Sequence, residues 1–341
     1  MVKYILMKFE NVQDLVKLPY FKVNSESKLV LRKGLVKKII DFHTHLGWYY
    51  LLADPVDLTK RSKTNHYFPE KGAAFNLKRY SALDFSLYTK RNCRNQIIKS
   101  AYTSNSFSST HTIPNILEEM DRMNVSQAVV HPIDYPAVTT NTTHLLNSLK
   151  NNKRLISFMS IHPLQRNKEE LVLRFKKRGA LGIKLHPTFQ LFKPTNRFAL
   201  EIYELADKHN LPILFHTGFS PLMPKFFRRF VAFDEFEKVV KDFPKTTFIL
   251  GHSAISEFER AARLGKKHDN VYLELSGQPP GDIKKIIKIM GNDKLFFGTD
   301  WPFYPIAISL AKVLLATEGN EISRKKILFK NAERLLNQSN L

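Results

Sequence analysis

Residues 196–218 read NRFALEIYELADKHNLPILFHTG and contain one complete unit of the pattern that decides the fold. In 196–209 apolar residues recur at three- and four-residue intervals, as at Ile202, Leu205 and Ala206, which predicts an amphipathic helix. Residues 212–218 form a short apolar run that ends in polar residues, which predicts a strand of a parallel sheet covered on both faces. The unit therefore indicates a helix followed by a buried parallel strand.

The same unit repeats along the chain in both directions. The expected strands are 36–45, 127–132, 155–163, 181–187, 212–218, 246–254, 271–277 and 294–300. The expected helices are 113–124, 142–151, 168–178, 196–209, 233–243, 256–267, 281–290 and 305–317, with a last one at 323–337 that should pack on the outside. Strict alternation over eight units predicts an α/β fold, a (β/α)₈ TIM barrel. A doubly wound open sheet is the alternative, but no glycine-rich phosphate loop follows the first strand.

Two segments depart from this rhythm. Residues 1–35 precede the first strand and are expected to form a small N-terminal capping element, so that the barrel spans 36–341. Residues 46–112 form an insertion after the first strand, far longer than an ordinary loop. Aromatic residues crowd this insertion: Trp48, Tyr49, Tyr50, Tyr67, Phe68, Phe75, Tyr80, Phe85 and Tyr88. A loop after a barrel strand lies on the active face, so 46–112 is interpreted as a lid, the alternative being a subdomain that covers barrel surface.

Composition restricts the class of protein. The 341 residues are 43% hydrophobic, which suits a folded domain, and no run suits a signal peptide or a bilayer span. The lone cysteine, Cys93, excludes an internal disulfide, and we expect a soluble, cytoplasmic protein with no membrane partner. The net charge of +22 is spread over the chain without any nucleic-acid-binding motif, so it is weak evidence for nucleic acid.

Polar residues stand at the carboxyl ends of the expected strands, where barrels place their function. Strand 36–45 ends in His43 and His45, and side-chain alternation gives these two one shared face. Later strand ends carry Lys184, His186, His216, His252 and Asp300. Imidazoles and a carboxylate converging on one barrel mouth suit zinc or a similar divalent ion. His131 and His162 each precede a proline at a strand end and could line the mouth or merely end a turn.

Five motifs in this order carry a resemblance: DFHTH (41–45), GIKLHP (182–187), PILFHTG (212–218), ILGHSA (249–254) and FFGTDWPF (296–303). Together they resemble the amidohydrolase superfamily, in particular the amidohydrolase-related branch that includes aminocarboxymuconate semialdehyde decarboxylase. The resemblance covers roughly residues 36–337 without the insertion.

The resemblance implies that His43, His45, His216 and Asp300 hold a divalent metal, with zinc expected. It also implies catalytic roles for Asp300, as acceptor of a water proton, and for His252, which would stabilise an oxyanion or carry a proton. One ion is favoured, and two would fit if Lys184 were carboxylated, as the equivalent lysine is in binuclear relatives. Lys184, His186 and Trp301 are expected to contact substrate, although Lys184 could also form a salt bridge inside the barrel.

The expected function is therefore metal-dependent hydrolysis of a small, anionic molecule by metal-activated water. A non-oxidative decarboxylase, a lyase on the same site, is the alternative. A non-catalytic electropositive binding protein is a third hypothesis, which the complete ligand set disfavours. The substrate and the homo-oligomeric state stay open.

Overall fold

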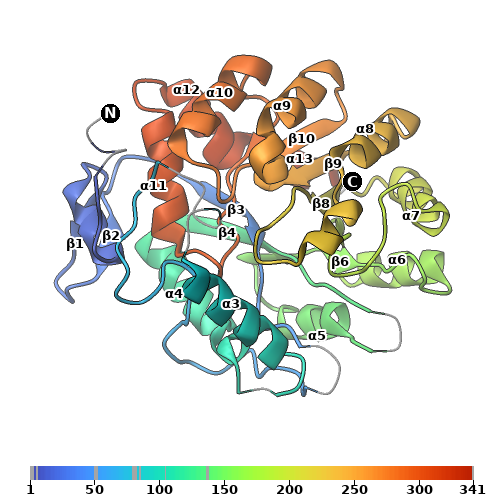
Figure 1. Cartoon of the computed structure of the whole chain (residues 1–341), viewed down its shortest axis with the longest axis horizontal. Helices are drawn as coiled ribbons and strands as arrows, with labels where there is room; N and C mark the ends of the chain where they lie inside the picture. Colours follow the sequence, from blue (N-terminus) through green and yellow to red (C-terminus); the bar gives the residue numbers. More distant parts are fainter. Residues whose placement is uncertain are drawn as a thin grey trace.

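The structure is a computed structural model of the chain, and it describes residues 4, 7–49, 53–78, 83, 86–103, 105–135 and 138–339. Eight parallel strand positions surround a common axis (Figure 1). They are β3 (Ile39–Thr44), β4 (Val125–Val130), β5 (Leu155–Ser157) with β6 (Met159–Ser160), β7 (Ile183–Leu185), β8 (Ile213–His216), β9 (Phe248–Gly251), β10 (Val271–Glu274) and β11 (Leu295–Phe296).

These strands form two sheets, with the orders β3-β4-β5 and β11-β10-β9-β8-β7-β6. Backbone hydrogen bonds on both sides join the sheets into a barrel. Phe158, between β5 and β6, donates its amide to Val130 (3.0 Å), and Phe42 of β3 donates to Phe297 beyond β11 (2.8 Å). The predicted (β/α)₈ barrel is confirmed.

Helices cover the outside of the barrel between successive strands (Figure 1). They are α4 (Ile113–Arg122), α5 (Asn141–Ser148), α6 (Lys168–Lys177), α7 (Arg197–Lys208), α8 (Phe233–Asp242), α9 (Phe258–Lys267), α10 (Pro280–Met290) and α11 (Ile306–Ala316). The bounds of each lie within three residues of those of an expected helix, because the apolar stripe that marks it in the sequence is the face that it buries.

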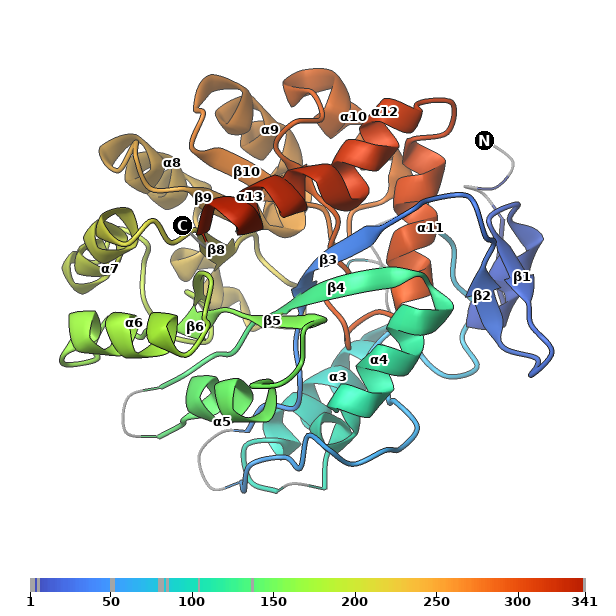
Figure 2. The same ribbon diagram turned by 180° about the vertical axis from the view of Figure 1, so that it is seen from behind.

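The interior of the barrel is filled with apolar side chains at the end opposite the polar strand ends. Phe42 and Phe296 stack there with ring centroids 4.4 Å apart. The C-terminal segment, α12 (Glu321–Lys325), the π-helical turn Lys326–Lys330 and α13 (Asn331–Ser339), passes across this end, as Figure 2 shows. Leu335 and Leu336 of α13 pack into the interior cluster. The sequence predicted that this last helix would pack on the outside. In the structure it lies across the end of the barrel and closes its interior.

The N-terminal residues form the turn Val12–Lys17 and an antiparallel hairpin, β1 (Phe21–Val23) and β2 (Leu29–Leu31), beside α11 and α4 (Figure 2). The insertion carries α3 (Leu87–Lys99) and the turn Phe107–Thr110. Tyr50, Tyr80 and Phe85 lie outside the described residues. Phe68 of the insertion donates its amide to Phe303 (2.9 Å), which fastens the insertion to the loop after β11. Among the described helices, none is both long and apolar enough for a membrane span.

Candidate functional site

A cavity of about 60 Å³ lies at the carboxyl ends of the strands. Four histidines and one carboxylate from strand ends line it: His45, His186, His216, His252 and Asp300. The remaining wall is mostly apolar: Trp48, Phe68, Ile97, Ile133, Phe189, Ser220, Leu222, Met223, Phe303 and Tyr304. None of the described lining residues is a lysine or an arginine. Three of them, Trp48, Phe68 and Ile97, come from the insertion, which therefore closes over the polar strand ends.

His43, His45 and Asp300 meet inside the mouth of the barrel. The Nε2 atom of His45 lies 3.4 Å from Asp300 Oδ1, and Nε2 of His43 lies 3.8 Å from the same oxygen. His45 Nδ1 lies 2.7 Å from the backbone oxygen of His131. Since a carbonyl only accepts, His45 must carry its proton on Nδ1, and its Nε2 keeps a free lone pair.

The local backbone explains how strand β3 aims both histidines inward. Phe42 already points into the barrel interior, so strict alternation would turn His43 outward. A register irregularity between Asp41 and Thr44 removes this conflict. Asp41 also accepts from the amide (3.0 Å) and the hydroxyl (2.6 Å) of Thr299, which fixes β3 to the residue before Asp300. Burial raises the pKa of Asp41 to about 7.

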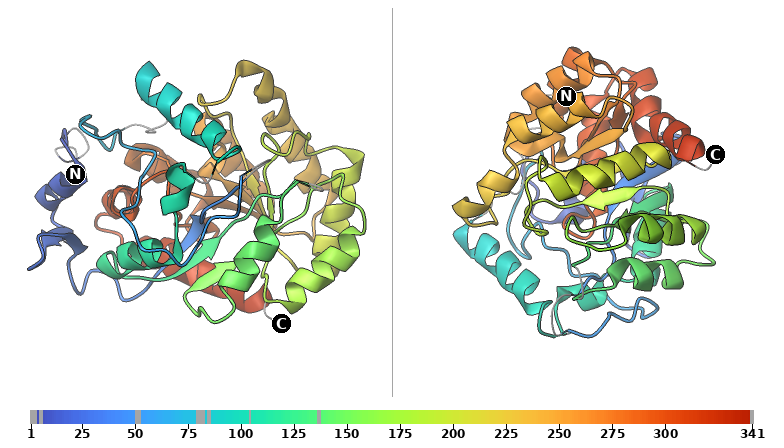
Figure 3. Two further views of the ribbon diagram at one scale, coloured as in Figure 1. Left: turned by 90° about the horizontal axis from the view of Figure 1, so that it is seen from below. Right: turned by 90° about the vertical axis from the view of Figure 1, so that its right-hand side faces the viewer.

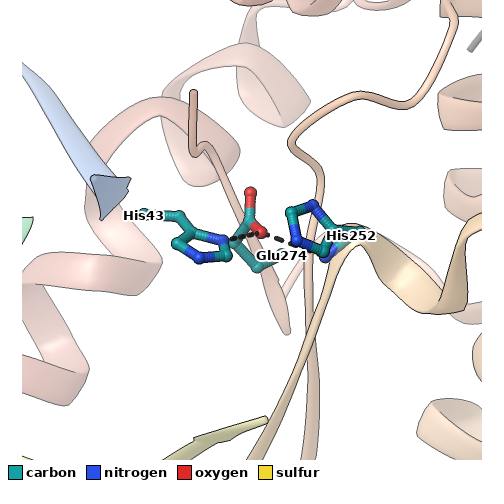
Figure 4. A group of neighbouring side chains, drawn as sticks. All are labelled: His43, His252 and Glu274. Carbon is teal, nitrogen blue, oxygen red and sulfur yellow. Dashed lines mark hydrogen bonds and ion pairs between the residues drawn. The ribbon is translucent and has the colours of Figure 1, made fainter. Parts of the chain in front are cut away.

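Glu274, at the end of β10, orients His43 and was missed by the sequence analysis. Its Oε2 lies 2.7 Å from His43 Nδ1 and also accepts from the His252 amide (3.1 Å) and the Ser276 hydroxyl (2.8 Å), as Figure 4 shows for the two histidines. Its Oε1 accepts from the Ser276 amide. Burial raises the pKa of Glu274 to about 8, while these donors favour the carboxylate. His43 therefore holds its proton on Nδ1 and presents Nε2 to the site. The signal in the sequence was a lone glutamate in the apolar run VYLEL (271–275).

Lys184 lies inside the barrel, buried beneath the cavity. Its Nζ is 2.9 Å from His43 Nε2, and it does not line the cavity wall. Burial lowers the pKa of Lys184 to about 7, although the negative charges of Asp300 and Glu274 act to raise it. The structure thus does not support the direct substrate contact predicted for Lys184, because its amine is directed at His43.

His252 sits in a left-handed turn that strand β10 and the loop after it hold in place. Residues 252–255 all have positive φ values (58°, 47°, 61° and 52°), which is uncommon for non-glycine residues. Gln278 donates to the backbone oxygens of His252 (2.7 Å) and Ile255 (3.0 Å). The Ser276 hydroxyl lies 2.7 Å from His252 Nδ1. These contacts fix the imidazole so that its Nε2 points towards His216.

His216 lines the same cavity but stands apart from His43, His45 and Asp300. Its Nδ1 lies 3.1 Å from His252 Nε2, and its ring stacks on His186 with centroids 4.0 Å apart. The three groups His43, His45 and Asp300 have donor atoms within 4.8 Å of one another, a set that does not include His216. As a fourth ligand, His216 would have to exchange its contact with His252 for the ion.

His186 faces the cavity as predicted, whereas Trp301 does not line it. The indole of Trp301 is fully buried among apolar residues, next to His111 with centroids 5.8 Å apart. The backbone at Asp300 is left-handed (φ 58°), and at this turn the Asp300 side chain enters the cavity while Trp301 packs into the core. The tryptophan of the cavity is Trp48.

His131 donates from Nε2 to the backbone oxygen of Phe42, and His162 donates from Nε2 to the backbone oxygen of Gln190 (both 2.9 Å).

The donor set of His43, His45 and Asp300 fits a divalent cation. Both imidazoles keep Nε2 unprotonated, although that of His43 is in contact with Lys184 Nζ (2.9 Å). Both rings are fixed from Nδ1 by an acceptor, and one carboxylate stands beside them, which is the pattern found around protein-bound zinc. A second group with close donor atoms comprises His43, His252 and Glu274. Its Nδ1–carboxylate contact is already a short hydrogen bond, so the first group is the better candidate.

The sequence profile of the amidohydrolase family matches residues 116–338. The chain belongs to this family. It is therefore an enzyme of the amidohydrolase type, built on the barrel that the family resemblance implied. No curated protein matches the sequence.

Solved structures with the same fold include enzymes of two reaction types. A probable 2-pyrone-4,6-dicarboxylic acid hydrolase from Acinetobacter baumannii, with citric acid bound, is 13% identical over 88% of this chain and 99% of that one, with a TM-score of 0.55. The 5-carboxyvanillate decarboxylase of Sphingomonas paucimobilis is 13% identical over 88% and 99%, with a TM-score of 0.60. A 5-carboxyvanillate decarboxylase from Novosphingobium aromaticivorans, complexed with manganese and a nitrobenzoic acid, is 16% identical over 65% and 79%, with a TM-score of 0.50. At these identities the likeness extends to the fold alone.

Proposed function

We propose that this amidohydrolase is a metal-dependent hydrolase of a small organic molecule. The observation that supports it most directly is the convergence of two unprotonated Nε2 atoms, of His43 and His45, with the Asp300 carboxylate. These three groups would hold the divalent ion, with zinc as the expected metal. His216 would complete the set after releasing His252.

A divalent ion held there would act as a Lewis acid at the reacting group and lower the pKa of nearby water. Asp300 accepts the proton of the attacking water through its carboxylate and returns it to the leaving group. His252, fixed by Ser276 and Gln278, faces the cavity, and once its Nε2 is protonated it stabilises the negative charge that develops on the substrate. Trp48 and Phe68 exclude bulk water, which strengthens each of these interactions.

The cavity wall defines the kind of substrate. Its aromatic and aliphatic residues suit an apolar molecular body, and only the strand-end groups offer polar contacts. An anionic group of the substrate would therefore meet the metal and the histidines, not Lys184. The cavity of about 60 Å³ is smaller than the roughly 150 Å³ that holds one benzene ring, so we propose that the insertion acts as a lid that moves when substrate enters.

Non-oxidative decarboxylation is the second candidate. The two similar decarboxylase structures favour it, and so does the apolar wall, because removing water from around a carboxylate assists loss of carbon dioxide. The same residues would serve: the metal ligands orient the carboxylate, and Asp300 or His252 supplies the proton that replaces it.

One pair of measurements separates the two candidates. Turnover of a panel of small aromatic and aliphatic esters, amides and carboxylic acids in ¹⁸O-labelled water would show label in the product of a hydrolase. Carbon dioxide released from unlabelled acid without label in the organic product would show a decarboxylase.

Activity should vanish in His45→Ala and persist in Trp301→Phe, because only the first residue faces the site. Bicarbonate-dependent uptake of a second ion would support the binuclear form with carboxylated Lys184, and its absence the mononuclear one.

A further inference from the structure

Two segments flank the mouth of the cavity and contain positive charge without any negative charge. Residues 86–103, which include α3, and residues 218–233, which follow β8, hold seven lysines and arginines and no acidic residue. The seven are Lys90, Arg91, Arg94, Lys99, Lys225, Arg228 and Arg229. No ion pair to a carboxylate involves any of the seven within the described part of the chain. The proposed function makes no use of this charge.

The two segments are neighbours on one face. Arg94 of α3 donates from Nε to the backbone oxygen of Leu222 (3.0 Å), and Cys93 packs in one apolar cluster with Leu222. Ile97 of α3 and Met223 line the same cavity. Figure 3 shows α3, in teal, and the gold segment near residue 225 projecting on the same side of the barrel. We call this surface, formed by the exposed residues of 86–103 and of 225–229, the mouth face.

The mouth face also exposes large apolar side chains. Leu87 is 86% exposed, Tyr88 69%, Tyr102 60%, Phe226 57% and Ile98 51%. Between them stand Arg91, Arg94 and Lys99 on the solvent side of α3, and the exposed Lys225, Arg228 and Arg229 of the turn Lys225–Phe230. The Arg229 guanidinium stacks over the Phe226 ring at 3.8 Å, which keeps this aromatic side chain at the surface. Glu70 accepts a hydrogen bond from the largely buried Thr89 at the edge of this surface.

The chemistry of the mouth face distinguishes between anionic partners. Basic residues alone would suit any polyanion, nucleic acid included. Leu87 and Ile98 are aliphatic, however, and cannot stack on bases, whereas aliphatic and aromatic side chains amid lysine and arginine suit the interface of an anionic lipid bilayer. An apolar cavity that opens beside such a surface would receive apolar molecules directly from the membrane.

We propose that the mouth face docks on the surface of an anionic lipid membrane. The six exposed cations, all but Lys90, contact lipid headgroups, and Leu87, Tyr88, Ile98, Tyr102 and Phe226 enter the interfacial layer. The protein is then peripheral, with its cavity facing the bilayer. This interaction revises the expectation from sequence that no membrane partner exists, and it does not depend on which reaction the site catalyses.

Vesicle flotation tests the proposal, with the full-length protein and vesicles of mixed phosphatidylserine and phosphatidylcholine or of phosphatidylcholine alone. We expect binding to the mixed vesicles that weakens as salt is raised. Each basic residue near an anionic surface contributes about a five-fold change in affinity, so the triple variant Lys225→Gln, Arg228→Gln and Arg229→Gln should bind on the order of 100-fold more weakly. A matched triple variant, Lys266→Gln, Lys267→Gln and Lys288→Gln, removes three exposed charges from the outer helices α9 and α10 and should bind like the native protein.

The apolar residues supply a second readout. Leu87→Ser with Phe226→Ser leaves every charge in place and should also weaken vesicle binding, because the interfacial contact is lost. Failure of the native protein to float with mixed vesicles would overturn the proposal, as would equal losses in the two triple variants. Equal binding to duplex RNA and to vesicles, unaffected by the serine substitutions, would overturn it in favour of a general polyanion surface. Unchanged thermal unfolding would show that each variant is folded.

Discussion

Replacement of Glu274 by glutamine tests how the candidate metal centre is held together. The substitution preserves the size of the side chain and removes its charge. In the native protein Oε2 accepts three hydrogen bonds, from His43 Nδ1 (2.7 Å), the His252 amide (3.1 Å) and the Ser276 hydroxyl (2.8 Å), and Oε1 accepts one, from the Ser276 amide. A glutamine amide would keep most of these bonds if its oxygen took the position of Oε2. Its NH₂ group would then face the Ser276 amide, so one buried donor would lose its acceptor.

The magnitude follows from this count. One buried donor without an acceptor costs about 1–3 kcal/mol in the free energy of unfolding. The larger effect is on the metal, since His43 loses the carboxylate that fixes its tautomer and raises the basicity of Nε2. Removing such a partner of a ligating histidine weakens metal affinity by roughly 10–100-fold, or about 1.4–2.7 kcal/mol.

The assay is competition for zinc or manganese between the protein and a chromogenic chelator, together with denaturant unfolding of the metal-free protein. Asp134→Asn is the matched control, because Asp134 is a carboxylate that accepts from the Thr142 amide (3.0 Å) and the Thr139 hydroxyl (3.0 Å) away from the metal ligands. We expect the control to lose stability but not metal affinity. Native metal affinity in Glu274→Gln would refute the assignment of Glu274 as the residue that positions His43.

Three further predictions concern the same end of the barrel. Gly298→Ala would push a methyl group against the Glu274 carboxyl and the His43 side chain, so the metal-free protein should lose about 1–3 kcal/mol in urea unfolding, and unchanged stability would contradict the packing described. Gln278→Ala removes two hydrogen bonds to the 252–255 turn, so kcat should fall while the metal content is unchanged, as measured by steady-state kinetics and metal analysis. An unchanged kcat would show that this turn does not contribute to catalysis. Burial opposes ionisation of Glu119, but the His66 imidazole 2.7 Å away nonetheless holds its pKa below the usual value. The stability that ionised Glu119 contributes is therefore complete above the ordinary glutamate pKa and is lost as the pH falls through the lowered pKa of Glu119. The melting temperatures of the native protein and of Glu119→Gln should thus converge on acidification, and a difference that stays constant with pH would contradict this.

The sequence predicted the barrel well because its evidence is periodic. Buried parallel strands and amphipathic helices each leave a long, regular apolar pattern, and the 196–218 unit corresponds closely to α7 and β8. Strand-end position was equally informative for His45, His186, His216, His252 and Asp300, because the carboxyl ends of parallel strands share one end of a barrel.

The remaining features depend on how individual side chains are directed. Lys184 is on the expected face, but its long side chain turns to His43, and no spacing rule fixes that direction. Trp301 follows Asp300 at a left-handed turn of the backbone (φ 58° at Asp300), and its side chain lies in the core instead of the cavity. Glu274 stands in an apolar strand with no motif around it, and its role emerges only from the donors that His43, His252 and Ser276 bring to it. The division into the segment 1–35 and the barrel, and the lid function of 46–112, stay predictions.

Metal analysis of the purified protein tests the central claim most directly. After incubation with zinc or manganese and removal of free ion, the native protein should retain about one divalent ion per chain, and His45→Ala should retain far less because one of three converging ligands is gone. Trp301→Phe, which leaves the site intact, should retain the native amount. A native protein that binds neither ion, or a His45→Ala variant that binds as much as the native protein, would contradict the proposed metal centre.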